Sequence, residues 1–318
     1  MAVKVLVTYD VAEADLERIR SVSDAVTVDK AASMEEALAN AAEAEVIHAG
    51  QWSDELWKSA PKLEWVQAGG AGVERFLTPD FVANPIVLTN AQGIYASPIA
   101  DQVMAFVLHF SRLFNELMRR QMNREWADWG EYDPDELVGK TLGVVGLGGI
   151  GSQVAKRANG FGMRVIATRK RPERPPELAD EVRGAEELPW LLRESDYVAL
   201  CAALTPKTRH LIGEDQLELM KRTAYLINVG RGGLVDEPAL VAALKRGGIA
   251  GAGLDVFEEE PLPSDSPLWD MPNVMITPHN AGSSPRSHER LMELFRENLR
   301  RYVAGEELVN VVDKDAGY

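Results

Sequence analysis

A glycine-rich segment near the middle of the chain has the spacing of a dinucleotide-binding loop. Residues 141–151 read TLGVVGLGGIG, which places the pattern G-x-G-x-x-G after a strand-like run and before a helix-like segment. The first glycine allows a tight turn, the second lets the backbone approach a pyrophosphate, and the third permits close packing of the helix. The phosphates then meet the unpaired N–H groups of a helix N-terminus. We therefore predict dinucleotide contacts from Gly146, Gly148, Gly149, Ile150 and Gly151.

Three cationic residues follow the next expected strand. A carboxylate at this place would accept hydrogen bonds from the ribose hydroxyls of NAD, but the sequence continues Thr168, Arg169, Lys170 and Arg171. Such cations pair well with a 2′-phosphate. The alternative is a solvated basic turn, which is less expected in a protein as acidic as this one. We therefore expect these four residues to contact the cofactor, with NADP preferred and NAD possible.

Three further segments look like the signatures of a known enzyme family. They are NVGRGG at 228–233, LDVFEEEPL at 254–262 and TPHNAG at 277–282. Together with the glycine-rich segment, and in the same order, they resemble the D-isomer-specific 2-hydroxyacid dehydrogenases, in particular the glyoxylate/hydroxypyruvate reductase type. The resemblance implies an oxidoreductase that reversibly transfers a hydride between NAD(P)H and a small 2-keto acid to give the D-2-hydroxy acid.

The resemblance also implies roles for individual residues. Arg231 would hold the substrate carboxylate and polarise its carbonyl, as a planar guanidinium can. His279 would give the carbonyl oxygen its proton, and Glu260 would hydrogen-bond this histidine. The further cofactor contacts implied are Thr205, Val229, Gly230 and Asp255, and the substrate contacts are Ala71, Gly72, Tyr95, Arg231 and His279.

Two segments depart from the family pattern. Glu74 stands where the family often has Asp, which affects support of the substrate loop more than chemistry. Residues 201–205 read CAALT where His-x-Pro-x-Thr is common, which weakens the expectation of contacts from this strand end. Tyr95, Trp52 and Trp269 are candidate walls of the substrate pocket. Core packing is the alternative for all three, and for Trp52 it is the preferred one.

Strand-like and helix-like segments alternate along the chain, which predicts an α/β fold. The resemblance implies two parallel-sheet domains, with a Rossmann nucleotide-binding domain inserted into a flavodoxin-like substrate domain. We therefore expect residues 1–98 and 287–318 to form the substrate-binding domain and residues 99–286 to form the NAD(P)-binding domain.

The composition limits the classes of partner. A net charge of −15 argues against nucleic acid or an anionic membrane surface, because phosphates would be repelled. Arginine outnumbers lysine, and the acidic balance resembles that of proteins from salt-loving organisms. The alternative is an acidic enzyme that its charge keeps soluble.

The single cysteine and the lack of long apolar runs limit the chain further. Cys201 cannot form an internal disulfide or a cysteine metal cluster, and its apolar neighbours predict an inert thiol. We predict no metal site. The sequence shows no signal peptide and no uninterrupted membrane-spanning run, which predicts a cytoplasmic protein.

The segment 119–130 carries Trp126 and Trp129 among polar residues, which is typical of an interface. In the family this arm wraps around a second subunit, so we expect a homodimer. Two other function classes remain: nucleotide-sensing corepressors that keep the same Arg, Glu and His, and other family dehydrogenases such as 3-phosphoglycerate dehydrogenase. The lack of long tails favours the enzyme, and the lack of a C-terminal regulatory domain favours a small 2-keto acid reductase.

Overall fold

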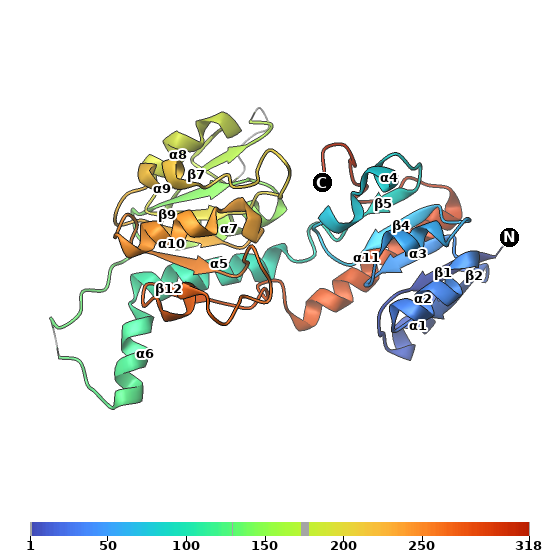
Figure 1. Ribbon diagram of the computed structural model, residues 1–318, viewed down its shortest axis with the longest axis horizontal. Helices are drawn as coiled ribbons and strands as arrows, with labels where there is room; N and C mark the ends of the chain where they lie inside the picture. The colour runs from blue at the N-terminus through green and yellow to red at the C-terminus, as the bar shows by residue number, and fades with distance from the viewer. Residues whose placement is uncertain (1, 129, 173–177, 318) are drawn as a thin grey trace. The chain divides into compact units, whose positions relative to one another are not determined.

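The protein, described here by a computed structural model, folds into two compact units (Figure 1). The first unit contains Met1–Tyr95 and Ser284–Tyr318, and the second contains Ala96–Ser283, so the second unit is an insertion into the first. The predicted boundaries, 98/99 and 286/287, lie three residues after these. The residues that the structure describes are 2–128, 130–172 and 178–317.

The first unit is built on a five-stranded parallel sheet of order β2-β1-β3-β4-β5, the order of flavodoxin-like folds. Two of its inner strands, Val46–Ala49 and Trp65–Ala68, are buried along their whole length, as strands covered on both faces are. Successive side chains enter opposite cores: Leu6 packs in one apolar cluster, whereas Val5 and Val7 pack in another. Its strands are β1 (Val3–Val7), β2 (Val26–Lys30), β3 (Val46–Ala49), β4 (Trp65–Ala68) and β5 (Val87–Thr89), and its N-terminal helices are α1 (Glu13–Arg20), α2 (Met34–Asn40), α3 (Asp54–Lys58) and α4 (Pro79–Val82).

The long helix α11 (Pro285–Ala304) completes the first unit. Its N-cap is Ser284, whose side chain accepts a backbone N–H from the first turn. Phe295 of α11 is fully buried, and its ring stacks on that of His48 with centroids 4.3 Å apart. Burial of such a side chain contributes roughly 1.5–3 kcal/mol. Burial also lowers the pKa of His48 to about 3, so its imidazole is a neutral part of the core.

The second unit is built on a seven-stranded parallel sheet of order β12-β11-β10-β9-β6-β7-β8. From β6 the chain adds β7 and β8 on one side and then crosses over to add β9 on the other, so the strand order reverses between β6 and β9. Ligands of such sheets bind beyond the carboxyl ends of the strands at this reversal. Its strands are β6 (Thr141–Val145), β7 (Arg164–Arg169), β8 (Glu181–Gly184), β9 (Tyr197–Leu200), β10 (Tyr225–Asn228), β11 (Gly251–Leu254) and β12 (Val274–Ile276).

Helices cover both faces of this second sheet. Tyr197 and Ala199 of β9 pack in a core shared with two of the helices, α5 and α7, whereas Val198 and Leu200 pack in a core shared with α8, α9 and α10. The predicted fold class, two parallel-sheet α/β domains that include a Rossmann domain, is confirmed. The helices are α5 (Ala96–Ser111), α6 (Phe114–Asn123), α7 (Gly149–Gly160), α8 (Leu188–Glu194), α9 (Glu214–Leu219) and α10 (Glu237–Lys245).

Helix α6 projects from the second unit (Figure 1). It carries a stripe of exposed apolar side chains. Phe114, Met118 and Met122 are 46%, 58% and 83% exposed. Because they are four residues apart, they line one side of the helix. Beyond its end, Trp126 is 92% exposed. Trp129, the other tryptophan of the predicted arm, lies outside the described residues.

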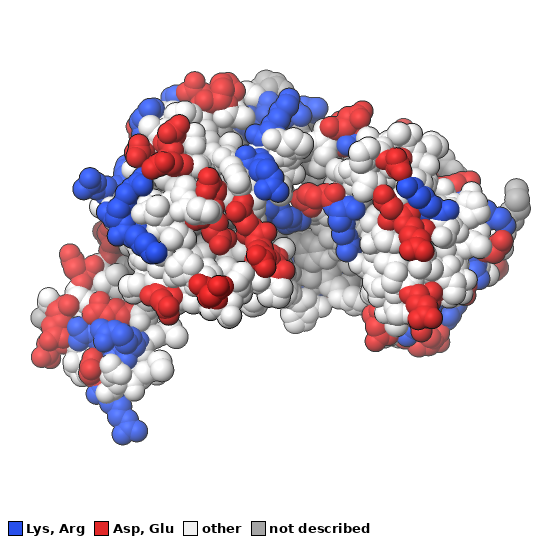
Figure 2. Space-filling view, viewed as in Figure 1, with Lys and Arg blue, Asp and Glu red and all other residues white. Residues whose placement is uncertain are grey.

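Figure 2 shows acidic and basic side chains interspersed on the visible face of each unit. Many of them pair, as Arg300 does with Glu297 and Glu306, and such exposed pairs contribute only about 0–1 kcal/mol each. The origin in a salt-loving organism stays a prediction. Across the described ranges, no helix combines the length and the apolar character that a bilayer span requires.

Candidate active site

The glycine-rich segment forms the turn between β6 and α7. Gly146 has a φ of 96°, in the left-handed region that glycine adopts without strain. A Cβ atom at this position would lie 2.8 Å from the amide nitrogen of Ala202. The amide of Gly146 donates to the carbonyl of Thr168 at 2.9 Å. The turn is therefore held between the ends of β7 and β9, at the reversal of strand order.

The N-terminus of α7 can be approached closely by a ligand. Around Gly148 and Gly149, no atom of the described residues lies within 4 Å of the place where a Cβ would stand. Gly151 is the opposite case, because a Cβ there would lie 2.4 Å from the carbonyl oxygen of Gly146. Ile150 packs against the core beneath α5 and α7. Open backbone at the helix start and tight packing one turn later are what pyrophosphate binding requires.

Strand β7 ends in cations rather than in a carboxylate. Thr168 is buried, Arg169 is partly exposed, and Lys170 and Arg171 are exposed. Because β7 pairs with β6 in parallel, with Thr168 beside Val145, these residues lie at the same edge of the sheet as the glycine turn. A ribose bound at this edge therefore meets positive charge.

Arg231 lies in a turn that follows β10. Asn228 brackets this turn: its Nδ2 donates to the carbonyl of Arg231 at 2.9 Å, and its Oδ1 accepts from the amide of Gly230 at 3.1 Å. A Cβ at Gly232 would lie 1.8 Å from the carbonyl oxygen of Phe257. Only glycine therefore lets this turn pack so closely against the chain that follows β11.

Glu260 and His279 form a hydrogen-bonded pair. Glu260 Oε2 lies 2.6 Å from His279 Nδ1, and Glu260 Oε1 accepts from the amide of Phe257 at 2.9 Å. Both carboxylate oxygens are thus held, and Nε2 is the ring nitrogen that Glu260 leaves available. His279 has a φ of 50°. This conformation costs a residue other than glycine roughly 1–3 kcal/mol, and such residues concentrate at functional sites.

The buried carboxylate of Asp255 holds the loop that carries His279. Its Oδ1 accepts from Thr277 Oγ1 at 2.5 Å and from the amide of Asn280 at 3.1 Å, and its Oδ2 accepts from the amide of Ala281 at 3.0 Å. The amide of His279 donates to the carbonyl of Asp255 at 2.8 Å. The family resemblance implies a cofactor contact for Asp255. This support of the histidine loop is a separate function that sequence reasoning missed.

The structure brings the three predicted catalytic residues to one cavity of about 230 Å³ in the second unit. This cavity joins loops that follow β9, β10, β11 and β12, so it lies at the carboxyl edge of the sheet. The residues that line it are Leu204, Arg209, Arg231, Gly232, Gly233, Phe257, Glu258, Glu260 and His279.

A second histidine–carboxylate pair stands beside this cavity, and sequence reasoning missed it. His210 Nε2 contacts Glu258 Oε1, and Arg209 Nη1 lies 4.0 Å from the same oxygen. The amide of Glu258 donates to Glu237 at 3.4 Å. Burial and the nearby carboxylates of Glu258 and Glu259 raise the pKa of Glu237. The acidic run EEE at 258–260 predicts exposed charge. Nothing in it indicates that Glu258 pairs with a histidine 48 positions earlier.

The remaining predicted cofactor residues lie at the same edge of the second sheet. Val229 is buried directly after β10, and a Cβ at Gly230 would lie 3.0 Å from the carbonyl oxygen of Ala202. The amide of Thr205 donates to Thr208 Oγ1 at 2.7 Å, which closes the turn after β9.

The predicted substrate loop belongs to the first unit and turns its carbonyl groups inward. Tyr95 Oη donates to the carbonyl of Gly69 at 2.7 Å, and Asn90 Nδ2 donates to that of Ala71 at 2.8 Å. The carbonyl of Gly70 accepts from the amide of Ala91 at 2.9 Å. Within the described residues, the amides of Gly70, Ala71 and Gly72 meet no acceptor. Successive free N–H groups of this kind form a concavity that favours anions.

Two of the candidate pocket walls have contacts within their own units. The Trp52 ring packs 4.9 Å from that of Phe76 and 5.2 Å from that of Phe81, in the core. Trp269 is 52% exposed and is absent from the lining of the catalytic cavity; its Nε1 donates to the carbonyl of Pro263. Burial raises the pKa of Cys201 to about 12, which makes its thiol a poor nucleophile.

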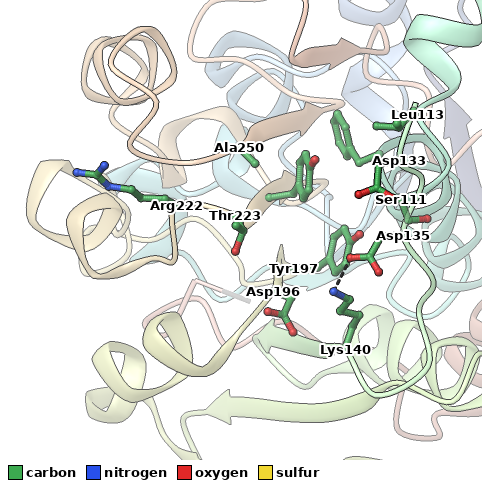
Figure 3. Close-up of a pocket in the computed structure, with 12 residues that line it drawn as sticks. Ser111, Leu113, Asp133, Asp135, Lys140, Asp196, Tyr197, Arg222, Thr223 and Ala250 are labelled. Carbon is green, nitrogen blue, oxygen red and sulfur yellow. Dashed lines mark ion pairs between the residues drawn. The ribbon is translucent and has the colours of Figure 1, made fainter. Parts of the chain in front are cut away.

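A larger cavity, of about 380 Å³, lies at the opposite edge of the second sheet (Figure 3). Tyr197 and Tyr225, the first residues of β9 and β10, stack with centroids 5.4 Å apart in its wall. Lys140 pairs with Asp135 beside them. Its place at the amino ends of the strands separates it from the catalytic loops. Within the described residues, no three His, Cys, Asp or Glu side chains gather into a group that could hold a metal ion.

Comparison with known proteins relates this site to one family. Residues 104–281 match the family model of the D-isomer specific 2-hydroxyacid dehydrogenase NAD binding domain. A glyoxylate reductase of Korarchaeum cryptofilum is 40% identical over 269 residues, which cover 82% of this chain and 79% of that protein. A D-3-phosphoglycerate dehydrogenase of Methanocaldococcus jannaschii is 36% identical over 316 residues, which cover 98% of this chain and 59% of that protein.

The solved structures include close structural relatives. One is a D-isomer specific 2-hydroxyacid dehydrogenase from Xanthobacter autotrophicus Py2 in complex with NADPH and MES, which superposes with a TM-score of 0.85 at 31% identity and full coverage of both chains. The family match spans more than half of this chain and includes every strand that carries the catalytic cavity. The chain therefore belongs to the D-isomer specific 2-hydroxyacid dehydrogenase family of oxidoreductases.

Proposed function

We propose that this chain reduces a small 2-keto acid of the glyoxylate or hydroxypyruvate type to the D-2-hydroxy acid, in a reversible reaction. The observation that carries the proposal is the Glu260–His279 pair on the same cavity as Arg231. The similarity to a glyoxylate reductase supports this substrate class.

Arg231 binds the substrate in this proposal. Its guanidinium offers five donors in a planar fork and remains charged at all relevant pH values. One donor, Nη1, is held by the carbonyl of Gly230 at 2.8 Å, which fixes the direction of the side chain. The fork then holds the carboxylate and polarises the adjacent carbonyl, where negative charge develops during reduction.

His279 supplies the proton that the carbonyl oxygen needs. Because its Nδ1 is engaged by Glu260, its Nε2 is the atom that faces the substrate and donates. Glu260 fixes the orientation of the ring, so that Nε2 is held toward the cavity. This geometry and the family resemblance support the proposed roles of Glu260 and His279.

The residues at the glycine turn fit a nicotinamide dinucleotide, because the backbone at Gly148 and Gly149 is open whereas Gly146 and Gly151 are closely packed. When bound, this cofactor supplies the hydride. We propose NADP as the preferred form, with NAD possible. The contacts would come from Gly146, Gly148, Gly149, Ile150, Gly151, Thr168, Arg169, Lys170, Arg171, Thr205, Val229, Gly230 and Asp255.

The first unit serves as the substrate-binding domain in this proposal. The free amides of Ala71 and Gly72 suit a carboxylate, and Tyr95 supports their loop through the carbonyl of Gly69. A second candidate activity is that of a 3-phosphoglycerate dehydrogenase, which the similarity over 98% of this chain favours. No observation specifically favours the corepressor alternative.

Replacing the proton donor tests the mechanism. We expect His279→Ala to lower kcat for keto-acid reduction by about 10²–10⁴, the usual contribution of a positioned general acid, with cofactor affinity retained. His210→Ala is the matched control, because His210 also pairs with a glutamate and also has a positive φ. Steady-state kinetics and cofactor fluorescence titration measure the two effects. Equal activity of the two variants would contradict the role of His279.

Replacing Arg231 tests substrate binding. We expect Arg231→Lys to lower kcat/KM by about 10- to 100-fold, because an ammonium group cannot hold carboxylate and carbonyl as a fork does, and each charge-assisted hydrogen bond contributes about 1.5–3 kcal/mol. Arg209→Lys, on the same cavity, is the control and should change kcat/KM by less than about threefold. If Arg231→Lys retains the wild-type kcat/KM, another residue binds the substrate.

Charge reversal at the end of β7 tests the cofactor preference. We expect the wild type to use NADPH with a higher kcat/KM than NADH, and Arg169→Asp to shift this ratio toward NADH by about 10- to 100-fold, since the 2′-phosphate loses a charge-assisted contact. Arg193→Asp is a control with the same change in net charge on an exposed site of the same unit. Both are measured at one ionic strength. A wild type that prefers NADH rules the hypothesis out.

The exposed stripe of α6 and Trp126 leads us to propose a homodimer. The apolar side chains of this stripe are up to 83% exposed. A contiguous exposed apolar patch is typical of an interaction site that a partner covers. We expect sedimentation at twice the 35.0 kDa chain mass, and a shift to monomer in a Met118→Glu, Met122→Glu double variant. A wild type that is monomeric at micromolar concentration would exclude this assembly.

A further inference from the structure

Arg75 of the first unit lies next to the start of the loop that carries Ala71 and Gly72. Its Nη2 donates to the carbonyl oxygen of Ala49 at 3.5 Å, and the amide of Gly69 donates to the same oxygen at 3.2 Å. The shared acceptor places the guanidinium beside the first residue of the loop. Arg75 therefore stands at the carboxyl edge of the sheet, where ligands of parallel sheets bind.

A buried aromatic ring supports this guanidinium. Its Cζ lies 4.9 Å from the centroid of the Phe76 ring. Phe76 is fully buried, and Trp52 packs 4.9 Å away. A guanidinium over an aromatic face gains about 0.5–1 kcal/mol at an exposed site. The ring thus supports a flat cation on an exposed residue, and the structure gives this cation one hydrogen bond, from Nη2 to the carbonyl of Ala49.

Arg75 differs from other cations of the first unit in its partners. Lys30, Lys58 and Lys62 each pair with a carboxylate, on Asp10, Asp80 and Glu43 respectively. Within the described residues, no carboxylate oxygen lies within salt-bridge distance of Arg75. Its contacts are one long hydrogen bond to a carbonyl and one aromatic ring.

The loop beside Arg75 adds further donors rather than acceptors. The carbonyls of Gly69, Gly70 and Ala71 are bound by other groups, whereas the amides of Gly70, Ala71 and Gly72 are not. A positive side chain next to a row of N–H groups is a site for negative charge on the ligand. The amides of the loop can hold one carboxylate, and the guanidinium of Arg75 has donors for a second anionic group.

We propose that Arg75 is a specificity-determining residue that binds a second anionic group, a carboxylate or a phosphate, on the tail of the 2-keto acid. The preferred substrates are then keto acids with two acidic groups. This inference rests on the proposed reduction of a 2-keto acid, and it extends the substrate class from glyoxylate and hydroxypyruvate to keto acids with a second anionic group. The planar fork of Arg75 suits either group, since both present two oxygens to it.

The test compares substrates that differ in their tails. Four keto acids are reduced by the wild type, Arg75→Gln and Arg75→Lys: glyoxylate, hydroxypyruvate, 2-ketoglutarate and 3-phosphohydroxypyruvate. We expect the wild type to show a higher kcat/KM for at least one of the last two than for glyoxylate. Arg75→Gln should lower that kcat/KM by about 10- to 100-fold, through KM, with a change of less than about threefold for glyoxylate. Arg75→Lys should retain part of the preference.

Lys58→Gln is the matched control, because it removes one positive charge from the same unit at a residue that pairs with Asp80. It should leave the ranking of the four substrates as in the wild type. The two anionic tails separate a carboxylate site from a phosphate site. An equal loss of kcat/KM on all four substrates would mean that Arg75 binds the carboxylate they share, and it would overturn the proposal. A wild type that reduces glyoxylate but neither dianion would also overturn it. A wild type that reduces none of the four would refute the proposed function itself.

Discussion

The geometry of the proposed catalytic site depends on one buried carboxylate. Asp255 is 2% exposed and receives three hydrogen bonds from the segment 277–281. A buried carboxylate needs such donors, since an unpaired one is very costly. Because the donors come from residues on both sides of His279, the carboxylate holds the imidazole at a fixed place and balances the cost of its left-handed backbone.

The register of the second sheet brings the other catalytic loops to the same level. Asn228, Leu254 and Ile276 stand side by side at the ends of β10, β11 and β12. The loops that carry Arg231, Glu260 and His279 therefore leave the sheet together. The close approach at Gly232 then lets the first two loops touch. The three proposed catalytic residues thus follow three neighbouring strand ends. The glycine turn after β6 lies on the same edge of the sheet.

Sequence reasoning succeeded where the signal is local. The spacing of Gly146, Gly148 and Gly151 follows from steric needs that act within one turn, and the alternation of elements predicts the two parallel sheets. The proposed catalytic residues were predicted through the resemblance, because the order of the motifs is known from relatives. The proposed cofactor preference rests on the residue types of the cations after β7 and on their place beside the glycine turn.

What sequence reasoning missed are interactions between distant segments. The support of the His279 loop by Asp255 and the contact of His210 with Glu258 join residues 22 or more positions apart. No sequence motif marks Arg75. Its proposed role rests on its contacts with the carbonyl of Ala49 and the ring of Phe76. Such pairings are created by the register of strands and by loop packing, and neither is encoded in spacing.

The insertion of the second unit has a consequence for the order of folding. Residues 96–283 are contiguous, so this unit can acquire its structure from one unbroken stretch of chain. The first unit cannot, because Phe295 and Leu299 of α11 fill its core and are synthesised after the whole insertion. Closing an unfolded loop of that length costs about 4–5 kcal/mol. Both ends of the inserted unit pack in one core, at Ala100 and Ala281. Folding of this unit before the first unit is complete would therefore shorten the loop that separates the two segments of the first unit.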